Sequence, residues 1–216
     1  MMIITNCTAT SQIWYRKNYS KENINKDYAR MVFSSKKLPL NDNDEKYAEI
    51  VIFDKNSDKP FAIAIGANPA RGEVDIFDKT NFKIAQKLKA TKKYKGYFLL
   101  NLYPFLTRSV KELNAHLNKI TLDEFRLLST MQIYIHMFLK NNINDVFIFW
   151  GDKISGPSAK YKHLLPFNLK LYIINCVIAG SNRFYYSADI HGDIIHPCKN
   201  DFDHFELLSK KNITKI

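Results

Sequence analysis

The sequence predicts an α/β protein, a three-layer α/β/α sandwich built around a central, mainly parallel sheet. Short continuous runs rich in Ile, Val, Phe and Tyr end at Gly, Pro or Asn, which is the pattern of strands buried on both faces. Segments of helical period separate these runs, and strand–helix alternation is typical of parallel sheets covered by helices. A length of 216 residues suits one domain with a substantial hydrophobic core.

Four apolar runs are predicted to be strands of this kind, at residues 61–65, 97–100, 146–150 and 171–179. Each run is followed by a glycine or an asparagine, namely Gly66, Asn101, Gly151 and Gly180. A further strand at residues 49–53 and a turn at 56–60 lead into the first run. The chain contains only seven glycines and seven prolines, so these stops indicate where it leaves the sheet.

Two long helices are predicted between the strands. Residues 78–93 place Phe82, Ala85 and Leu88 at three-residue steps. Residues 121–140 open with Thr121-Leu122-Asp123-Glu124, a capping-box sequence. The helical period of residues 121–140 places six side chains on one face of this helix: Leu122, Phe125, Leu128, Gln132, Ile135 and Leu139. A shorter helix at 158–165 and a closing helix at 201–211 complete the prediction.

The first part of the chain has a different character. Residues 1–48 contain Asn, Lys, Ser and Asp between scattered aromatic residues. We expect them to form an N-terminal extension packed on a single α/β domain of residues 49–216.

The charge has two explanations. The formal net charge is +11, and the chain has 26 Lys, 6 Arg and 20 Asn. An excess of positive charge indicates an anionic partner, of which nucleic acid is the most obvious. Lys, Asn, Ile, Tyr and Phe also have A/T-rich codons, so genomic base composition accounts for the same numbers. The charge alone does not decide between them.

The sequence also indicates the cellular compartment in which the protein is expected. A run of 18 uninterrupted apolar residues is absent, so no membrane span is predicted, and the first residues lack the pattern of a secretory signal. The three cysteines, Cys7, Cys176 and Cys198, are widely spaced and odd in number, so no disulfide framework is expected. We therefore expect a cytoplasmic protein, with Cys176 in the core.

The chemistry-bearing residues gather where the predicted strands end. In parallel sheets the ligand site lies beyond the carboxyl ends of the strands. One end carries Gly66-Ala67-Asn68-Pro69, and another carries Asn101. An Asn side chain both donates and accepts hydrogen bonds, so it can hold a water molecule or the edge of a base. Taken alone, the first of these segments is also an ordinary turn at the end of a strand.

Two further motifs lie later in the chain. Trp150-Gly151 follows the third apolar run, with Lys153 close behind, and His196-Pro197 lies near the C-terminus. Taken singly, His196 is as well explained by a structural role as by a catalytic one. His191, His196, Cys198 and His204 match no standard zinc-ligand spacing, so we predict no metal and no cofactor.

Taken together and in their order along the chain, these motifs resemble those of the uracil-DNA glycosylase superfamily. The segments are GANPA at 66–70, GYFLLN at 96–101, VFIFWG at 146–151 and IIHP at 194–197. The pattern also resembles a bacterial and phage family described only as a domain of unknown function, number 1643. The elements shared with that family are Asn68-Pro69, Asp78 and Thr80, Asn101-Leu102 with Arg108, Trp150-Gly151 and His196-Pro197.

The resemblance to the glycosylases implies a mechanism. Asn101 would hold a base flipped out of the DNA, and Phe77 would stack on it. Asn68 would direct a water molecule at the sugar C1′, while His196 would stabilise the negative charge that develops on the leaving base. The protein would then excise uracil or a modified pyrimidine from DNA.

The same resemblance implies binding residues around these two catalytic candidates, Asn68 and His196. The turn residues Gly66, Ala67 and Pro69 would line the base pocket. Contacts to the phosphates would come from Arg108, Gly151, Lys153 and Lys199. The lysines between 83 and 95 could add a basic face, although a merely solvated surface explains them equally well.

The chain departs from the glycosylase pattern at informative positions. Asn68 replaces the Asp of the uracil-specific members, so it is a weaker activator of water. Ala70 stands where those members carry a Tyr that excludes methyl groups, so the pocket would admit larger pyrimidines. Cys198-Lys199-Asn200 follows His196-Pro197 and lacks the Leu that wedges duplex strands apart. Single-stranded DNA or a free nucleotide is therefore favoured as substrate.

Two other functions remain open. The same cleft could bind nucleic acid or a nucleotide without catalysis, which fits Asn68 and the altered segment after Pro197. Alternatively, the protein could be a phage-type protein that acts on a host protein partner, since fold does not dictate function.

Overall fold

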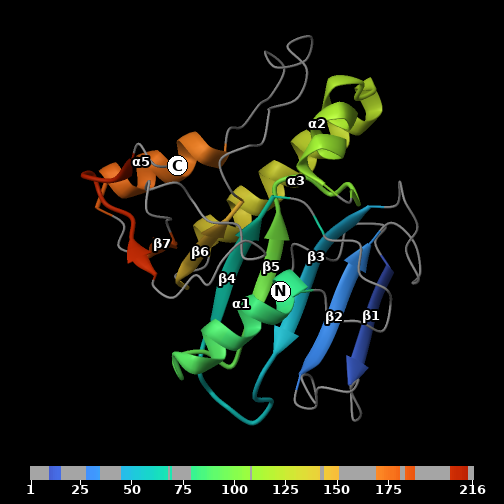
Figure 1. The fold of residues 1–216 in the computed structure, drawn as a ribbon. Coiled ribbons are helices and arrows are strands. Elements are labelled where there is room, and N and C mark those ends of the chain that lie inside the picture. Colours follow the sequence, from blue (N-terminus) through green and yellow to red (C-terminus); the bar gives the residue numbers. More distant parts are fainter. Residues whose placement is uncertain are drawn as a thin grey trace.

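The computed structural model describes residues 10–15, 28–34, 45–67, 69, 79–107, 109–141, 144–150, 169–180, 183–187 and 205–213. They form one mixed sheet of eight strands with helices on both sides (Figure 1). The strands are β1 Thr10–Tyr15, β2 Ala29–Ser34, β3 Lys46–Ile52, β4 Phe61–Gly66, β5 Gly96–Asn101, β6 Val146–Phe149, β7 Phe184–Tyr186 and β8 Glu206–Leu207. The helices are α1 Lys79–Ala90, α2 Val110–Asn118, α3 Leu122–Asn141 and α5 Leu169–Ile178.

The centre of the sheet is parallel. The strand order is β1-β2-β3-β5-β4-β6-β7-β8, and β5, β4, β6 and β7 pair in parallel. The flanking strands pair antiparallel, β1, β2 and β3 on one side and β8 on the other. The predicted α/β fold with a central parallel sheet is therefore confirmed, and antiparallel strands extend it at both edges.

Alternation along β4 divides the core into two halves. Ala62 and Ala64 are fully buried in a cluster with Ile84 and Leu88 of α1. Ile63 and Ile65 point to the opposite face, where their cluster includes residues of α3 and α5. Successive side chains of a strand alternate between faces, so a continuous apolar strand needs helices on both sides. The small alanines on one face let α1 approach the sheet closely.

The α2–α3 region forms a third, smaller core. Leu113 and Leu117 of α2 are fully buried with Phe125 and Leu128 of α3. The predicted helix over 121–140 is confirmed, but its first apolar residue, Leu122, is 40% exposed. Helix α2 was not predicted; Ser109 begins it, accepting a hydrogen bond from Glu112 N at 3.2 Å.

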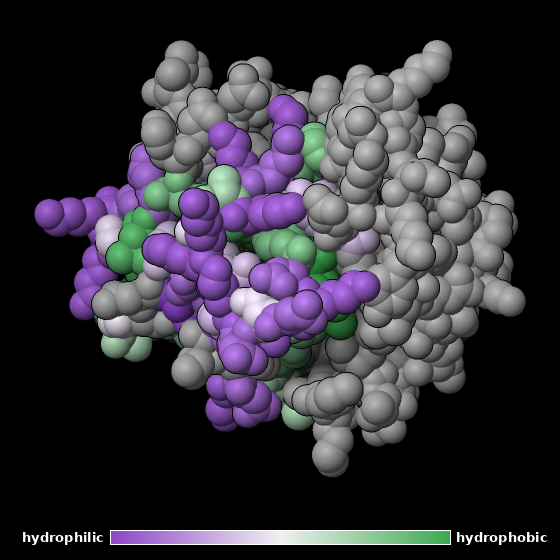
Figure 2. Space-filling view, turned by 90° about the horizontal axis from the view of Figure 1, so that it is seen from below, coloured by the Kyte–Doolittle hydropathy of each residue, from purple (hydrophilic) through white to green (hydrophobic). Residues whose placement is uncertain are grey.

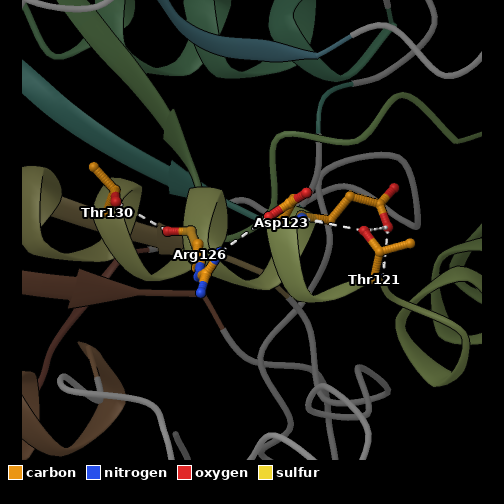
Figure 3. A network of polar contacts seen from close by, with 5 residues as sticks. Thr121, Asp123, Arg126 and Thr130 are labelled. Carbon is orange, nitrogen blue, oxygen red and sulfur yellow. Dashed lines mark hydrogen bonds and ion pairs between the residues drawn. The ribbon is translucent and has the colours of Figure 1, made fainter.

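The start of α3 is held by the predicted capping box. Thr121 Oγ1 accepts from Glu124 N at 3.2 Å, and Glu124 Oε2 accepts from Thr121 N at 2.8 Å. Figure 3 shows this end of α3, with Arg126 reaching back to Asp123 and Thr130 Oγ1 donating to the Arg126 carbonyl. Partial burial opposes ionisation of Glu124, but the bonds from Thr121 and the nearby His116 hold its pKa below the ordinary value.

We expect Thr121→Ala to destabilise the protein by about 1 kcal/mol, because Glu124 N loses its acceptor and Glu124 Oε2 loses one of its two donors. Since the folded pKa of Glu124 is lowered, its contribution is present above the unfolded pKa and is lost as pH falls through the folded pKa. The deficit of the variant should therefore shrink in acid, as measured by urea unfolding at neutral and acidic pH. Thr130→Ala, on an exposed turn of the same helix, should change stability by less than about 0.5 kcal/mol.

One predicted strand is a helix. Residues 171–179 were expected to form a buried strand, but they belong to α5, and the neighbouring strand is β7. Ile173 and Val177, four residues apart, face the core, whereas Leu171 and Ile178 are more than half exposed. A continuous apolar run does not distinguish a buried strand from a helix. Gly180, with φ +93°, lies just beyond α5 in the left-handed conformation that commonly ends helices.

The predicted C-terminal helix over 201–211 is also wrong within the described residues. Residues 205–213 form the short strand β8 and a turn, with Asn212 Oδ1 accepting from Ser209 N at 2.6 Å. Strand β8 pairs with β7, and Leu208 joins the core beside it. Pairing with the sheet edge overrides the local helical preference of this segment. The predicted helix at 158–165 lies outside the described residues.

The N-terminal strands extend the same sheet. β1 pairs with β2, and β2 pairs with β3 over residues on both sides of the expected boundary at 48. That boundary falls inside β3, whose other edge pairs with β5. No helix among the described residues is long and apolar enough to cross a membrane.

Candidate functional site

The candidate site lies where β5 ends. Asn101 is the last residue of this strand and is 2% exposed. Its Nδ2 is buried and has no hydrogen-bond partner in the described part of the structure. A buried donor without a partner costs about 1–3 kcal/mol, so native proteins rarely retain one without a reason. The amide is therefore available to a ligand.

Gly66 leaves the space that the side-chain amide of Asn101 occupies. Gly66 pairs with Asn101 in the parallel β4–β5 ladder, and a Cβ on Gly66 would lie 2.7 Å from Asn101 Oδ1. Any larger residue would push the carboxamide out of its position. Glycine is thus required at this position for close approach of the Asn101 side chain.

The two chain segments leave the sheet together. Leu102 N donates to Gly66 O at 3.0 Å, and Tyr103 N donates to Ala67 O at 2.9 Å. Ala67 is 2% exposed and Pro69 is buried. Burial raises the pKa of Tyr103 to about 12, so its phenol stays neutral at physiological pH. These bonds extend the strand pairing beyond the sheet and hold the segment after β4 next to the segment after β5.

The third strand end is that of β6. Gly66 pairs with Phe149 on this side, and Trp150, directly after β6, is 6% exposed. The chain passes from β4 through α1 to β5 on one side of β4, whereas β6 leads through α5 to β7 on the other side (Figure 1). The point between β4 and β6 is therefore a topological switch point, where open α/β sheets bind ligands.

The structure brings together part of the predicted site. Gly66, Ala67 and Asn101 meet at one end of the sheet, and Pro69 is buried in the segment that leaves β4. The remaining candidates lie outside the described residues: Asn68, Phe77, Arg108, Gly151, Lys153, His196 and Lys199.

The end of the lysine-rich segment 83–95 lies away from Asn101. Lys95 is the residue before β5, and Phe53 N donates to its carbonyl oxygen at 2.7 Å. A strand rises about 3.3 Å per residue, so the six residues of β5 separate Lys95 from Asn101 by about 20 Å. Lys95 therefore lies at the opposite end of β5 from a base held by Asn101.

A buried charge network near the site was not predicted. Lys46 Nζ lies 2.5 Å from Glu49 Oε2, and the two residues are 4% and 0% exposed. Glu49 Oε2 also accepts from Asn81 Nδ2 at 3.1 Å, while Tyr97 OH contacts Asn81 Oδ1 at 3.1 Å. The network joins β3 and β5 to the first turn of α1. Two opposite charges three residues apart at the start of a strand are the signal that could have revealed it.

Lys46 places one side of the network at the same end of the sheet as Asn101. Lys46 N donates to Pro104 O at 2.9 Å, three residues after Asn101. The network therefore holds together the beginning of β3 and the beginning of α1.

No group of three or more His, Cys, Asp or Glu side chains that could hold a metal ion occurs within the described ranges.

A family comparison places the chain among known sequences. The family model described as "Protein of unknown function (DUF1643)" matches residues 51–184. The chain belongs to this family. The DUF1643 region contains Gly66 and Asn101, together with β4, β5, β6 and all four described helices, and it ends at the first residue of β7. His196 and Lys199 follow the end of the DUF1643 match. Comparisons with curated proteins and with solved structures gave no match.

Proposed function

We propose that the protein is a DNA glycosylase-like enzyme that excises uracil or a modified pyrimidine from DNA. The observation that carries the proposal is the buried Asn101 Nδ2, which has no partner in the described residues and lies on β5, next to the strand β4 that borders the switch point. Its Nδ2 would donate to a carbonyl oxygen, and pyrimidine bases present such oxygens along the edge that an amide reads. Support also comes from the ordered motifs that resemble the uracil-DNA glycosylase superfamily, since one of them begins at Gly66 and another ends at Asn101.

The proposed reaction hydrolyses the bond between the base and the sugar. Water, held by Asn68, attacks C1′ while the C1′–N bond breaks and its electrons pass to the base. His196 stabilises the resulting anion, which takes up a proton as the base departs. Asn101 acts earlier, by holding the base edge. Burial strengthens this contact because a polar interaction away from water has little competition from solvent.

Asn101→Leu tests this role with two opposite effects. Leu resembles Asn in shape and removes the unpaired donor, so the free protein should gain about 1 kcal/mol of stability. Release of the base should fall about 10- to 100-fold, because a hydrogen bond to the reacting base is lost. The measurements are urea unfolding and base release from oligonucleotides that carry uracil or modified pyrimidines, single-stranded and duplex.

Two further variants sharpen the comparison. Gly66→Ala keeps the amide but displaces it, so release should also fall. Asn118→Leu, at an exposed position of α2, should leave release unchanged. A loss of stability in Asn101→Leu would mean that the amide is structural. Binding of DNA or nucleotide with no release from any substrate would replace the enzyme with a non-catalytic binder. Absence of both would favour an action on a protein partner.

A further inference from the structure

The end of the sheet opposite to Asn101 carries a lysine platform, formed by residues 53–60 and 86–95. It comprises the β3–β4 turn, the last turn of α1 and the α1–β5 connection. Its seven lysines are Lys55, Lys59, Lys87, Lys89, Lys92, Lys93 and Lys95. Figure 2 shows the molecule from this end, where hydrophilic side chains predominate on the described surface.

Backbone hydrogen bonds join the parts of the platform. Phe53 N and Asp54 N both donate to Lys95 O, at 2.7 and 3.1 Å, and Lys95 N donates to Pro60 O at 3.1 Å. The lysines of the turn and those of the helix end are therefore held in one unit. The lysine side chains are therefore attached to a backbone that does not need to reorganise when a partner binds.

Acidic residues are fewer than lysines within the platform itself. Within the platform the acidic residues are Asp54 and Asp58, and Asp54 Oδ1 accepts from Asn56 N within the turn. Asp145, which precedes β6, is engaged by the Tyr94 hydroxyl at 2.5 Å. Favourable interaction with the α1 dipole explains lysines in its last turn, but not those of the β3–β4 turn. Seven lysines against two aspartates give the platform an excess of five positive charges, which complements an anionic partner.

The surroundings identify the kind of partner. The large apolar side chains exposed in the described residues are Leu122, Ile133, Met137, Leu171, Ile178 and Leu207, none of them on the platform. A membrane-inserting surface needs such side chains. Protein interfaces are enriched in aromatic residues and Arg and depleted of Lys. Phosphates, by contrast, are bound by Lys as well as by Arg, with Lys acting as a point charge.

We propose that the lysine platform binds the phosphate backbone of a nucleic acid, at a surface separate from the Asn101 site. The binding is independent of sequence, because ammonium groups on phosphates carry no base information. About 20 Å of sheet separates the two surfaces, so a strand on the platform is not the base-bearing segment at Asn101. The inference does not require base excision.

The test compares two triple variants of the full chain that lose the same charge. Lys59→Gln/Lys92→Gln/Lys93→Gln removes exposed lysines of the platform, and Lys111→Gln/Lys119→Gln/Arg126→Gln removes exposed cations of α2, the α2–α3 connection and the start of α3. The probes are a labelled random-sequence DNA duplex and a labelled single strand, titrated at salt concentrations between about 50 and 200 mM. Anionic lipid vesicles serve as a third probe.

The platform variant should bind at least one nucleic-acid probe about tenfold or more weakly at low salt, and its salt slope should decrease by about 2–3. The control variant should stay within about threefold, because its charges lie on α2, the α2–α3 connection and the start of α3, at the end of the molecule opposite to the platform (Figure 1). Equal losses in both variants, no binding of either nucleic acid, or binding confined to vesicles would overturn the proposal. Asn101→Leu should retain backbone binding, so failure of base excision and failure of the platform are distinguishable.

Discussion

Replacing Gly96 with alanine is expected to destabilise the protein by about 3 kcal/mol or more, because the added methyl group has no space between the strands. Gly96 begins β5 and pairs with Ile52 of β3 and Phe61 of β4. A Cβ at this position would overlap the carbonyl oxygen of Val51 and would lie 2.8 Å from Phe61 Cε1 and 3.0 Å from Ile52 Cα. Two of these three atoms are backbone, so the strands themselves would have to separate.

Urea unfolding and the yield of folded protein measure this effect. Gly180→Ala is the matched control, because no atom lies within 4 Å of a Cβ at Gly180 and only its φ of +93° opposes the change. That strain costs about 1 kcal/mol. If Gly96→Ala proved as mild as Gly180→Ala, the β3–β5 pairing would have to be looser than the structure indicates.

Breaking the buried Lys46–Glu49 pair is expected to have an effect of similar size. Glu49→Gln should destabilise the protein by about 3–5 kcal/mol, because it leaves the Lys46 ammonium buried opposite a neutral amide. Lys46→Met should act in the same way by leaving the Glu49 carboxylate with Asn81 as a neutral partner. Both should be measured by denaturant unfolding at neutral pH.

The double variant separates the cost of burying one unpaired charge from the net contribution of the ion pair to stability. Lys46→Met/Glu49→Gln should be less destabilised than the sum of the single variants, because neither charge remains buried alone. The exposed pair of Asp123 and Arg126, also three residues apart, provides the control. Asp123→Asn should cost less than about 0.5 kcal/mol. Additive single effects would mean that water reaches the Lys46–Glu49 pair.

The candidate site was predictable where it depends on strand ends. The runs before Gly66 and Asn101 are strands, and in the predicted parallel sheet their carboxyl ends lie at the same edge. That the two strands are neighbours comes from the structure. The orientation of the Asn101 amide over Gly66 was not predictable, because it depends on an atomic approach across two strands. The Lys46–Glu49 pair was missed for the same reason, since its burial is created by α1 and β5.

The sequence by itself determined β3, β4, β5 and β6, the first turn of α3 and the polar residues at the strand ends. Local periodicity and helix capping depend on residues that are close together in the sequence, and they need no distant partner. Only the tertiary structure decided that residues 171–178 lie in a helix, that β8 joins the sheet edge, and that the late lysines of α1 lie opposite to Asn101. These outcomes depend on long-range pairing, which selects among local conformations of similar energy.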